Sequence, residues 1–140
     1  MVKSEIKCIT GYALPYATMN QIKSSYFYNN IDPDHWAGFH EWEAVFDEVT
    51  MDGDKLHGYV EVDGNPAAYL IMSSGWDIHF GLVSGYQALY ILPEHRTRRV
   101  QREVANLMRR MEHKEGCGLI LDTRHVDGKL IQKLREVRRG

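Results

Sequence analysis

Arg96, Arg98, Arg99 and Arg102 cluster where a strand-like segment gives way to a helical one, within Leu89–Val104 (LYILPEHRTRRVQREV). Backbone N–H groups at a helix N-terminus have no intrahelical partner, and the helix dipole adds partial positive charge there. Arginine side chains add bidentate, charge-assisted hydrogen bonds to phosphate oxygens. The cluster therefore predicts a binding site for a polyanion such as a pyrophosphate at the start of a helix.

Three predicted elements position this cluster. A strand within GYQALYIL ends at Pro93, and a helix follows from about Thr97 to Lys114, with Gly116 as its natural end. The apolar face of that helix consists of Val100, Val104, Leu107, Met108 and Met111. The apolar run CGLILDT then has the character of a buried strand. A strand, helix, strand order requires a crossover, for which a right-handed parallel connection is the default.

Upstream of this unit, the sequence predicts two helices and a β-hairpin. The first helix lies in LPYATMNQIKSSYFYNN, with Thr18 as its N-cap and its end near Asn29 and Asn30. The second lies in DPDHWAGFHEWEAVFDEV, where apolar residues recur at helical spacing. The hairpin joins strands at 59–62 and 68–72 through the turn sequence DGNP.

A last helix is predicted after Asp127, which would cap it, with Leu130, Ile131, Leu134 and Val137 on its inward face. No internal repeat or linker divides the chain, so residues 1–140 are expected to form one domain. The order of elements predicts an α/β (α+β) fold: a mixed, mainly antiparallel sheet with helices on both faces.

The segment ALYILPEHRTRRVQREVANLM resembles the acyl-CoA-binding motif of the GNAT superfamily of N-acyltransferases. In that family an L-x-V-x-P strand end precedes an Arg or Gln, the pattern x-x-G-x-G/A, and a long helix. The hairpin VEVDGNPAAYL is similar to the family's second and third strands, and the resemblance covers roughly residues 56–138. The resemblance implies acyl transfer from acetyl-CoA, or a related acyl-CoA, to an amine-bearing small molecule or protein.

The resemblance also implies which residues bind the acyl-CoA. The strand backbone at Leu89 and Ile91 would donate N–H groups, and Arg96 takes the family's basic position. The pyrophosphate would lie on the turn and first helical residues, namely Thr97, Arg98, Arg99, Val100 and Gln101.

The sequence departs from the family pattern at three places. Arg99 and Gln101 stand where glycine or alanine is usual, and Arg135 lies near the place of the family's late tyrosine. The two strands that usually end the family's fold are expected to be lacking, and a second subunit in a homodimer could supply the missing pairing. These departures leave a second hypothesis open: a catalytically inactive GNAT-fold protein that acts as a protein-binding or regulatory module.

Candidate general bases are carboxylates near the predicted central strands, Glu61 and Asp122, with Asp77 and His79 as further candidates. No metal site is predicted, because HWAGFHEWE lacks the HExxH pattern. The aromatic residues of the N-terminal half are expected mostly in the core, with some lining an acceptor pocket between the first helices and the sheet. These residues are Tyr26, Tyr28, Trp36, Phe39 and Trp42.

Composition narrows the class of protein. The net charge of −2 and the pI near 6.4 argue against a general nucleic-acid binder. The two cysteines, Cys8 and Cys117, are far apart and suggest neither a disulfide framework nor a zinc site. No apolar stretch is long enough to span a membrane, and the N-terminus lacks a secretory signal, so a cytoplasmic protein is expected.

Overall fold

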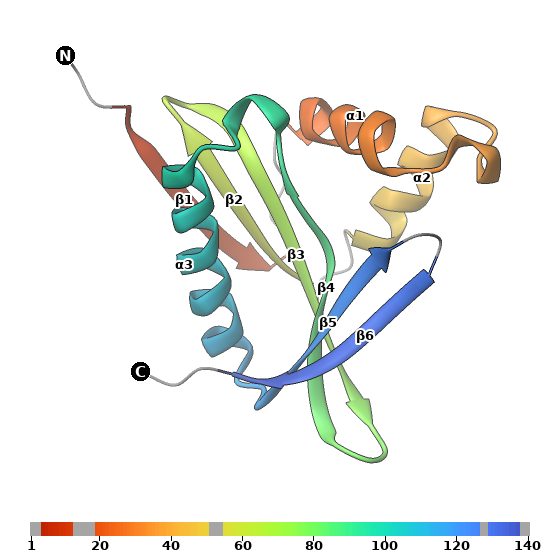
Figure 1. The fold of residues 1–140 in the computed structure, drawn as a ribbon, viewed down its shortest axis with the longest axis vertical. Helices are drawn as coiled ribbons and strands as arrows, with labels where there is room; N and C mark the ends of the chain where they lie inside the picture. Colours follow the sequence, from red (N-terminus) through yellow and green to blue (C-terminus); the bar gives the residue numbers. More distant parts are fainter. Residues whose placement is uncertain (1–3, 13–18, 51–54, 127–128, 138–140) are drawn as a thin grey trace.

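The computed structural model describes residues 4–12, 19–50, 55–126 and 129–137, in which a six-stranded sheet carries three α-helices (Figure 1). The strands are β1 (Ile6–Tyr12), β2 (Leu56–Val62), β3 (Asn65–Asp77), β4 (Gly81–Ile91), β5 (Leu119–Val126) and β6 (Lys129–Glu136). The helices are α1 (Met19–Asn30), α2 (Phe39–Thr50) and α3 (Arg98–Glu115), with short 3₁₀ turns at Pro33–His35 and Pro93–His95. The strands lie in sequence order, and every pair is antiparallel except β4 with β5.

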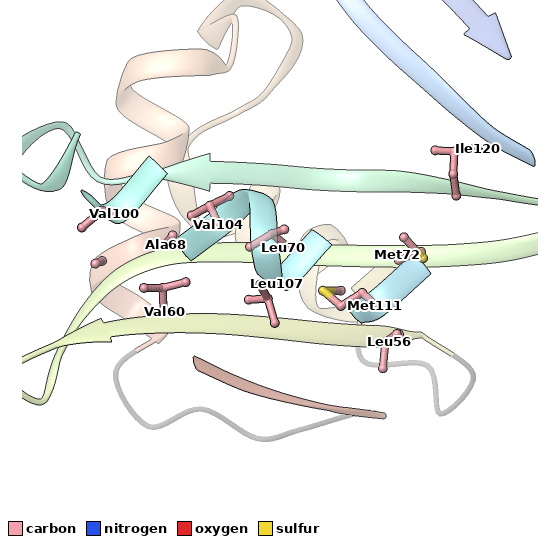
Figure 2. Close-up of a cluster of buried hydrophobic side chains, with 11 residues drawn as sticks. Leu56, Val60, Ala68, Leu70, Met72, Val100, Val104, Leu107, Met111 and Ile120 are labelled. Carbon is pink, nitrogen blue, oxygen red and sulfur yellow. The ribbon is translucent and has the colours of Figure 1, made fainter. Parts of the chain in front are cut away.

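Helix α3 covers one face of the sheet, which we call the α3 face. Its apolar stripe is buried against apolar side chains of β2 and β3 (Figure 2). The cluster includes Val100, Val104, Leu107 and Met111 from the helix and Leu56, Val60, Leu70 and Met72 from the strands. Thr97 caps the helix, and Gly116 ends it in the left-handed conformation with a φ of 71°. The predicted helix and its end at Gly116 are therefore confirmed, and Thr97, near which the helix was predicted to begin, is its N-cap.

Helices α1 and α2 cover the opposite face, which we call the α1/α2 face. Ile22 of α1 is buried against Tyr59, Tyr69, Ile71 and Tyr90 of the sheet. The prediction of a mixed, mainly antiparallel sheet with helices on both faces is confirmed. Both N-terminal helices were also predicted; the proposed N-cap Thr18 lies outside the described residues.

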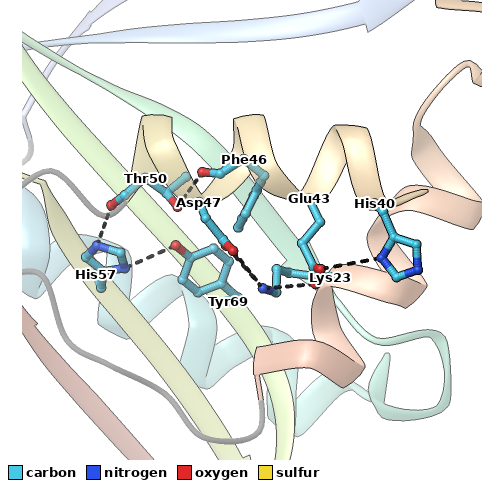
Figure 3. A network of polar contacts seen from close by, with 8 residues as sticks. All are labelled: Lys23, His40, Glu43, Phe46, Asp47, Thr50, His57 and Tyr69. Atoms are coloured by element: carbon cyan, nitrogen blue, oxygen red, sulfur yellow. Dashed lines mark hydrogen bonds and ion pairs between the residues drawn. The ribbon is translucent and has the colours of Figure 1, made fainter. Parts of the chain in front are cut away.

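A polar network anchors α2 over this face (Figure 3). The buried His57 ring contacts the backbone oxygen of Thr50 through Nε2, at 2.9 Å, and the hydroxyl of Tyr69 through Nδ1, at 3.1 Å. Lys23 of α1 forms ion pairs with Glu43 and Asp47 of α2, both at 3.1 Å. These contacts fix the two helices against each other and against β2.

The β2–β3 hairpin and the parallel pairing of β4 with β5 are confirmed. The turn of the hairpin falls at Asp63 and Gly64, which have φ values of 50° and 79°. Two strands were not predicted. One is β1, which pairs along its full length with β2. The other is β6, which replaces the predicted last helix.

The prediction of a helix after Asp127 is wrong, because Lys129–Glu136 pairs with β5 as an antiparallel strand. The register runs from Leu119 opposite Glu136 to Val126 opposite Lys129. Two residues, Asp127 and Gly128, lie between the strands and outside the described residues, so the proposed cap is not described. An Asp-Gly pair between two strand-like runs is also a strong hairpin signal. The backbone hydrogen bonds of an eight-residue ladder with β5 outweigh the helical spacing of the apolar residues. The last element of the described chain is therefore a strand, β6, which lies at the edge of the sheet.

Candidate functional site

A cleft opens where β4 and β5 separate. The two strands pair only from Val83 to Gly85, opposite 119–121, although β4 continues to Ile91 and β5 to Val126 (Figure 1). The cleft has a volume of about 410 Å³ and draws its walls from α1, β4, α3 and β5. Its lining residues are Tyr26, Asn30, Tyr86, Gln87, Ala88, Leu89, Met108, Leu121, Asp122 and Thr123. The separation of two parallel strands thus creates a slot that passes between the helix layers.

A bulge in β4 stands at the entrance of this slot. Ala88 pairs with Ile71 of β3, and Tyr86 pairs with Met72, so Gln87 is the additional residue between them. Such a bulge bends a strand and increases its twist. The bulge falls just beyond Gly85, the last residue of β4 paired with β5, and so contributes to the separation of the two strands.

The open edge of β4 presents backbone donors to the cleft. The N–H of Leu92 donates to the carbonyl of Ala67 on the β3 side, at 2.8 Å. Because successive strand residues direct their N–H groups to alternate sides, those of Ile91 and Leu89 point to the other side. In the described part of the chain, β4 has no partner strand on that side beyond Gly85. Two N–H groups are therefore available to a bound carbonyl or amide oxygen.

The turn after β4 leads into α3, and several of its backbone N–H groups already have acceptors within the turn. Thr97 N–H donates to the His95 carbonyl at 2.8 Å, and Thr97 Oγ1 accepts from Val100 N–H at 3.2 Å. The N–H of Gln101 donates to the Thr97 carbonyl at 3.0 Å. Of the five amides from Thr97 to Gln101, only those of Arg98 and Arg99 have no acceptor among the described residues.

The arginines of this turn have different environments. Arg96 folds back: its Nε donates to the Ile91 carbonyl at 3.0 Å, and its guanidinium lies 5.5 Å from the centre of the Tyr90 ring. The side chains of Arg98 and Arg99 are exposed beside their free amides. The first turn of α3 contains no acidic residue. Backbone donors, helix dipole and guanidinium charge thus coincide at Arg98 and Arg99, as anion binding requires.

A chain of polar side chains borders the cleft. The hydroxyl of Tyr86 donates to Glu112 at 2.7 Å, and Arg135 donates to both oxygens of Glu112 at 2.9 and 2.7 Å. Arg135 Nε also donates to Asp122 Oδ2 at 2.7 Å. Burial raises the pKa of Tyr86, and its hydrogen bond to Glu112 adds to this effect. Burial alone would raise the pKa of Glu112, but the hydrogen bonds from Arg135 and Tyr86 outweigh it and lower that pKa.

The predicted catalytic carboxylates lie in different places. Asp122 lines the cleft. Glu61 lies on β2, opposite Lys7 and Pro66, and is absent from the cleft lining. Asp77 is exposed at the end of the β3–β4 hairpin, where its side chain accepts from the N–H groups of His79 and Phe80. Among these candidates only Asp122 reaches the cleft.

Sequence reasoning missed Tyr86, Glu112 and Met108 as cleft or network residues. Tyr86 and Met108 belong to the strand and helix that flank the arginine cluster, but only the separation of β4 from β5 makes them cleft residues. Tyr26 of α1 lines the cleft and lies edge-on to Tyr90, at 5.2 Å between ring centres. Trp42 is buried as expected, whereas Tyr28 is exposed.

The described residues contain neither a metal-binding group nor a membrane-spanning helix. No group of three or more His, Cys, Asp or Glu side chains gathers there in a geometry that could hold a metal ion. No described helix is long and apolar enough to cross a membrane.

The sequence matches no protein-family model and no curated protein. Solved structures do match. The aminoglycoside N-acetyltransferase AAC(6')-Iy, solved with a bisubstrate analogue, aligns with a TM-score of 0.61 at 14% identity, over 89% of this chain and 82% of that one. A GCN5-related N-acetyltransferase from Ralstonia eutropha gives 0.63 at 14% identity, over 84% and 82%.

A spermidine N-acetyltransferase from Vibrio cholerae, solved with CoA and spermine, aligns with a TM-score of 0.59 at 18% identity, over 83% of this chain and 70% of that one. Identities this low establish the shared fold and nothing finer. The resemblance seen in the arginine turn is nevertheless confirmed at the level of architecture. The chain has the fold of the GNAT acyl-CoA N-acyltransferases.

Proposed function

We propose that the protein transfers an acyl group from acetyl-CoA, or a close relative, to an amine. The observation that carries the proposal is that one strand, β4, connects the cleft to the arginine turn. β4 forms one wall of the cleft and carries two outward N–H groups at Leu89 and Ile91. The chain then leads from Ile91 to the free amides of Arg98 and Arg99, the first two residues of α3. A ligand with an anionic end and a linear amide-rich arm fits such a path.

Each part of the path has a role in the proposal. The pyrophosphate lies against the first turn of α3, held by the amides and side chains of Arg98 and Arg99. Thr97, Val100 and Gln101 shape this turn through their own hydrogen bonds, and Arg96 fixes it to the end of β4. The N–H groups on the open edge of β4 bind the arm of the acyl donor and polarise its thioester carbonyl.

The chemistry needs a proton acceptor as well as a carbonyl donor. The amine nitrogen attacks the thioester carbon, the carbon–sulfur bond breaks, the nitrogen loses a proton and the thiolate gains one. Asp122 is the base candidate that lines the cleft, and its second oxygen, Oδ1, is not the one bound by Arg135. Tyr26 and Asn30 of α1 flank the opposite side of the cleft, where an acceptor amine would enter.

The first test is calorimetric binding of acetyl-CoA and free CoA at two salt concentrations. Arg98→Glu should weaken binding by at least tenfold, because it replaces an attractive charge with a repulsive one beside a free amide. Arg109→Glu makes the same change of charge on α3, in a residue outside the proposed cradle, and should leave affinity within about twofold. Equal effects of both variants would contradict the placement of the pyrophosphate.

Turnover is the second test. Release of free thiol from acetyl-CoA is measured with a panel of amines that includes a polyamine and an aminoglycoside, the classes named for two of the structural neighbours. Turnover that is lost in Arg98→Glu supports the transferase.

The alternative function is a GNAT-fold module that binds a protein and does not catalyse acyl transfer. It is favoured by Arg99 and Gln101, which stand where the family pattern has glycine or alanine. Absence of CoA binding at millimolar ligand, in a folded protein, would support this module and reject the transferase. Binding without turnover on any amine would reject catalysis alone.

A further inference from the structure

A hollow of about 500 Å³ lies on the α1/α2 face, and no described residue of α1 or α2 lines it. In Figure 1 those helices lie over the upper part of the sheet, and the β3–β4 hairpin extends below them. The floor of the hollow is one row of paired residues that crosses β3, β4, β5 and β6, namely Ser73, Gly85, Leu121 and Leu134. Ser73 shares the face of Ile71, which packs in the cluster of Ile22 from α1, because alternate strand residues point to the same side.

The hollow is deep because its floor contains two glycines. A Cβ added at Gly75 would meet no atom within 4 Å, and one added at Gly85 would contact only Leu121, at 3.4 Å from its carbonyl oxygen. A side chain at either position would therefore take up space in the hollow. The volume falls within the range of about 300 to 1,000 Å³ that is usual for small-molecule sites.

Apolar side chains surround this floor. Val83, Leu121 and Leu134 come from the strands, and Phe80 comes from the tip of the β3–β4 hairpin. Phe80 and Leu134 are 55% and 38% exposed, so both have surface that a ligand can cover. Ser73 and Gln132 add a hydroxyl and an amide. An apolar lining with few polar groups is suited to a ligand with an apolar body.

The charges around the hollow are few and balanced. Among the described lining residues only Lys55 and Asp77 carry charge. Lys55 forms no ion pair with another described residue. Asp77 already accepts the N–H groups of His79 and Phe80 through Oδ1. A polycation needs several carboxylates to replace its hydration, so this lining favours a ligand with at most one positive charge.

The hollow adjoins the cleft at Leu121, which lines both. Gly85 of the floor is followed by Tyr86 of the cleft, and Leu121 is followed by Asp122, the proposed base. An amine at this junction thus borders the same cleft as the base, while its substituent extends into the hollow.

We propose that the hollow holds the body of the acyl acceptor, and that the acceptor is a monoamine with an apolar, ring-sized substituent, of the arylalkylamine class. The inference rests on the proposed function and concerns its acceptor. It separates this chain from the aminoglycoside and spermidine N-acetyltransferases that share its fold.

Steady-state turnover tests the class of acceptor. With acetyl-CoA at saturation, kcat/KM is measured for phenylethylamine, spermidine and an aminoglycoside. Phenylethylamine should exceed both polycations by about tenfold or more, because burial of its ring contributes at least 1.4 kcal/mol. A preference for either polycation would overturn the proposed acceptor and leave acyl transfer intact.

A matched pair of variants on β6 tests the place where the acceptor binds. Leu134→Lys puts an ammonium into the hollow and should raise the KM for phenylethylamine about tenfold, with the KM for acetyl-CoA unchanged. Leu130→Lys makes the same change on the same face of the same strand, outside the hollow. It should leave both KM values within about twofold. Both residues are exposed, so circular dichroism should show the fold retained. Equal effects of the two variants on the KM for phenylethylamine would overturn the placement.

An NMR titration tests the hollow independently of catalysis. Phenylethylamine is added to the protein with and without CoA, and backbone amide shifts are followed. Shifts centred on Ser73, Val83 and Leu134, and lost in Leu134→Lys, would retain the hollow as a site for an apolar amine even if no amine were acylated. In that case only the proposed transfer would fail. No shift up to about 10 mM amine, or shifts centred elsewhere, would overturn the site.

Discussion

Arg135 of β6 donates through Nε to Oδ2 of Asp122 on β5, at 2.7 Å, while its two terminal nitrogens bind Glu112 of α3. One guanidinium thus joins the last strand to a carboxylate in the cleft and to a buried carboxylate on the helix. Arg135 therefore links the architecture of the C-terminal hairpin to the electrostatics of the cleft.

Arg135→Gln should destabilise the protein by about 2 kcal/mol near neutral pH, because it leaves the Glu112 carboxylate buried without its cation. The pKa of Glu112 is lowered in the folded wild type from an ordinary value of 4.5. The stability that this group contributes is therefore present above that value and is lost as the pH falls through the folded pKa. The difference between variant and wild type, measured by urea denaturation, should shrink in acid. Arg102→Gln on the exposed face of α3 is the control.

Asp122→Asn should lower kcat by about a hundredfold if its carboxylate accepts the amine proton, with a smaller effect on the KM for acetyl-CoA. Glu61→Gln, two strands away from β4 and outside the cleft lining, should stay within about twofold of the wild type. The pH dependence of kcat/KM, measured on one reactive amine, is the readout. An Asp122→Asn enzyme with unchanged kcat would remove this residue from the chemistry.

His57 should make the protein sensitive to mild acid. Burial lowers the pKa of His57 from its ordinary value of 6.5, against the opposing hydrogen bond to Thr50 (Figure 3). The unfolded chain thus binds more protons than the folded one, so stability is full above about pH 6.5 and falls as the pH drops toward the folded pKa. The slope of unfolding free energy against pH cannot exceed about 1.4 kcal/mol per unit for one proton. His57→Gln should flatten that slope, whereas the exposed His79→Gln should preserve it.

The elements predicted best from sequence are those specified by local signals. Helix α3 combines a helical apolar stripe with a glycine at its end, and both signals agree with its structure. The β2–β3 hairpin likewise follows from a turn sequence between two strand-like runs. In both cases the residues that decide the conformation are close in sequence.

The last strand was mispredicted because its conformation depends on a distant partner. Leu130, Ile131, Leu134 and Val137 have a spacing that also suits a helix, and only pairing with β5 distinguishes the two. Because residues 129–136 were predicted as a helix, the polar network of Arg135 with Glu112 and Asp122 was not predicted. Arg135 reaches Glu112 only because, as a strand residue opposite Ile120, it faces α3.

Gly58→Ala should destabilise the core beneath α3 by about 1–3 kcal/mol, because an added Cβ would lie 2.6 Å from Met111 Sδ and 3.0 Å from Leu107 Cδ2. Figure 2 shows Leu107 and Met111 of α3 packed over β2. The absence of a side chain at Gly58 leaves room for these two side chains. Gly75→Ala, in a strand position with no atom within 4 Å of the added Cβ, is the control. Equal thermal denaturation of the two variants would contradict the close packing of α3 on β2.

Arg99→Gly tests whether the turn has adapted to arginine. Glycine would restore the family pattern and open the backbone to phosphate, but it would remove a guanidinium beside a free amide. We expect acetyl-CoA affinity to fall about tenfold, the loss of one charge-assisted phosphate contact. Arg109→Gly makes the same substitution in the interior of α3, outside the cradle, where the cost in helix propensity is at least as large, and should leave affinity unchanged after correction for stability. A gain in affinity for Arg99→Gly would mean that the arginine obstructs the phosphate site, which would favour the non-catalytic module.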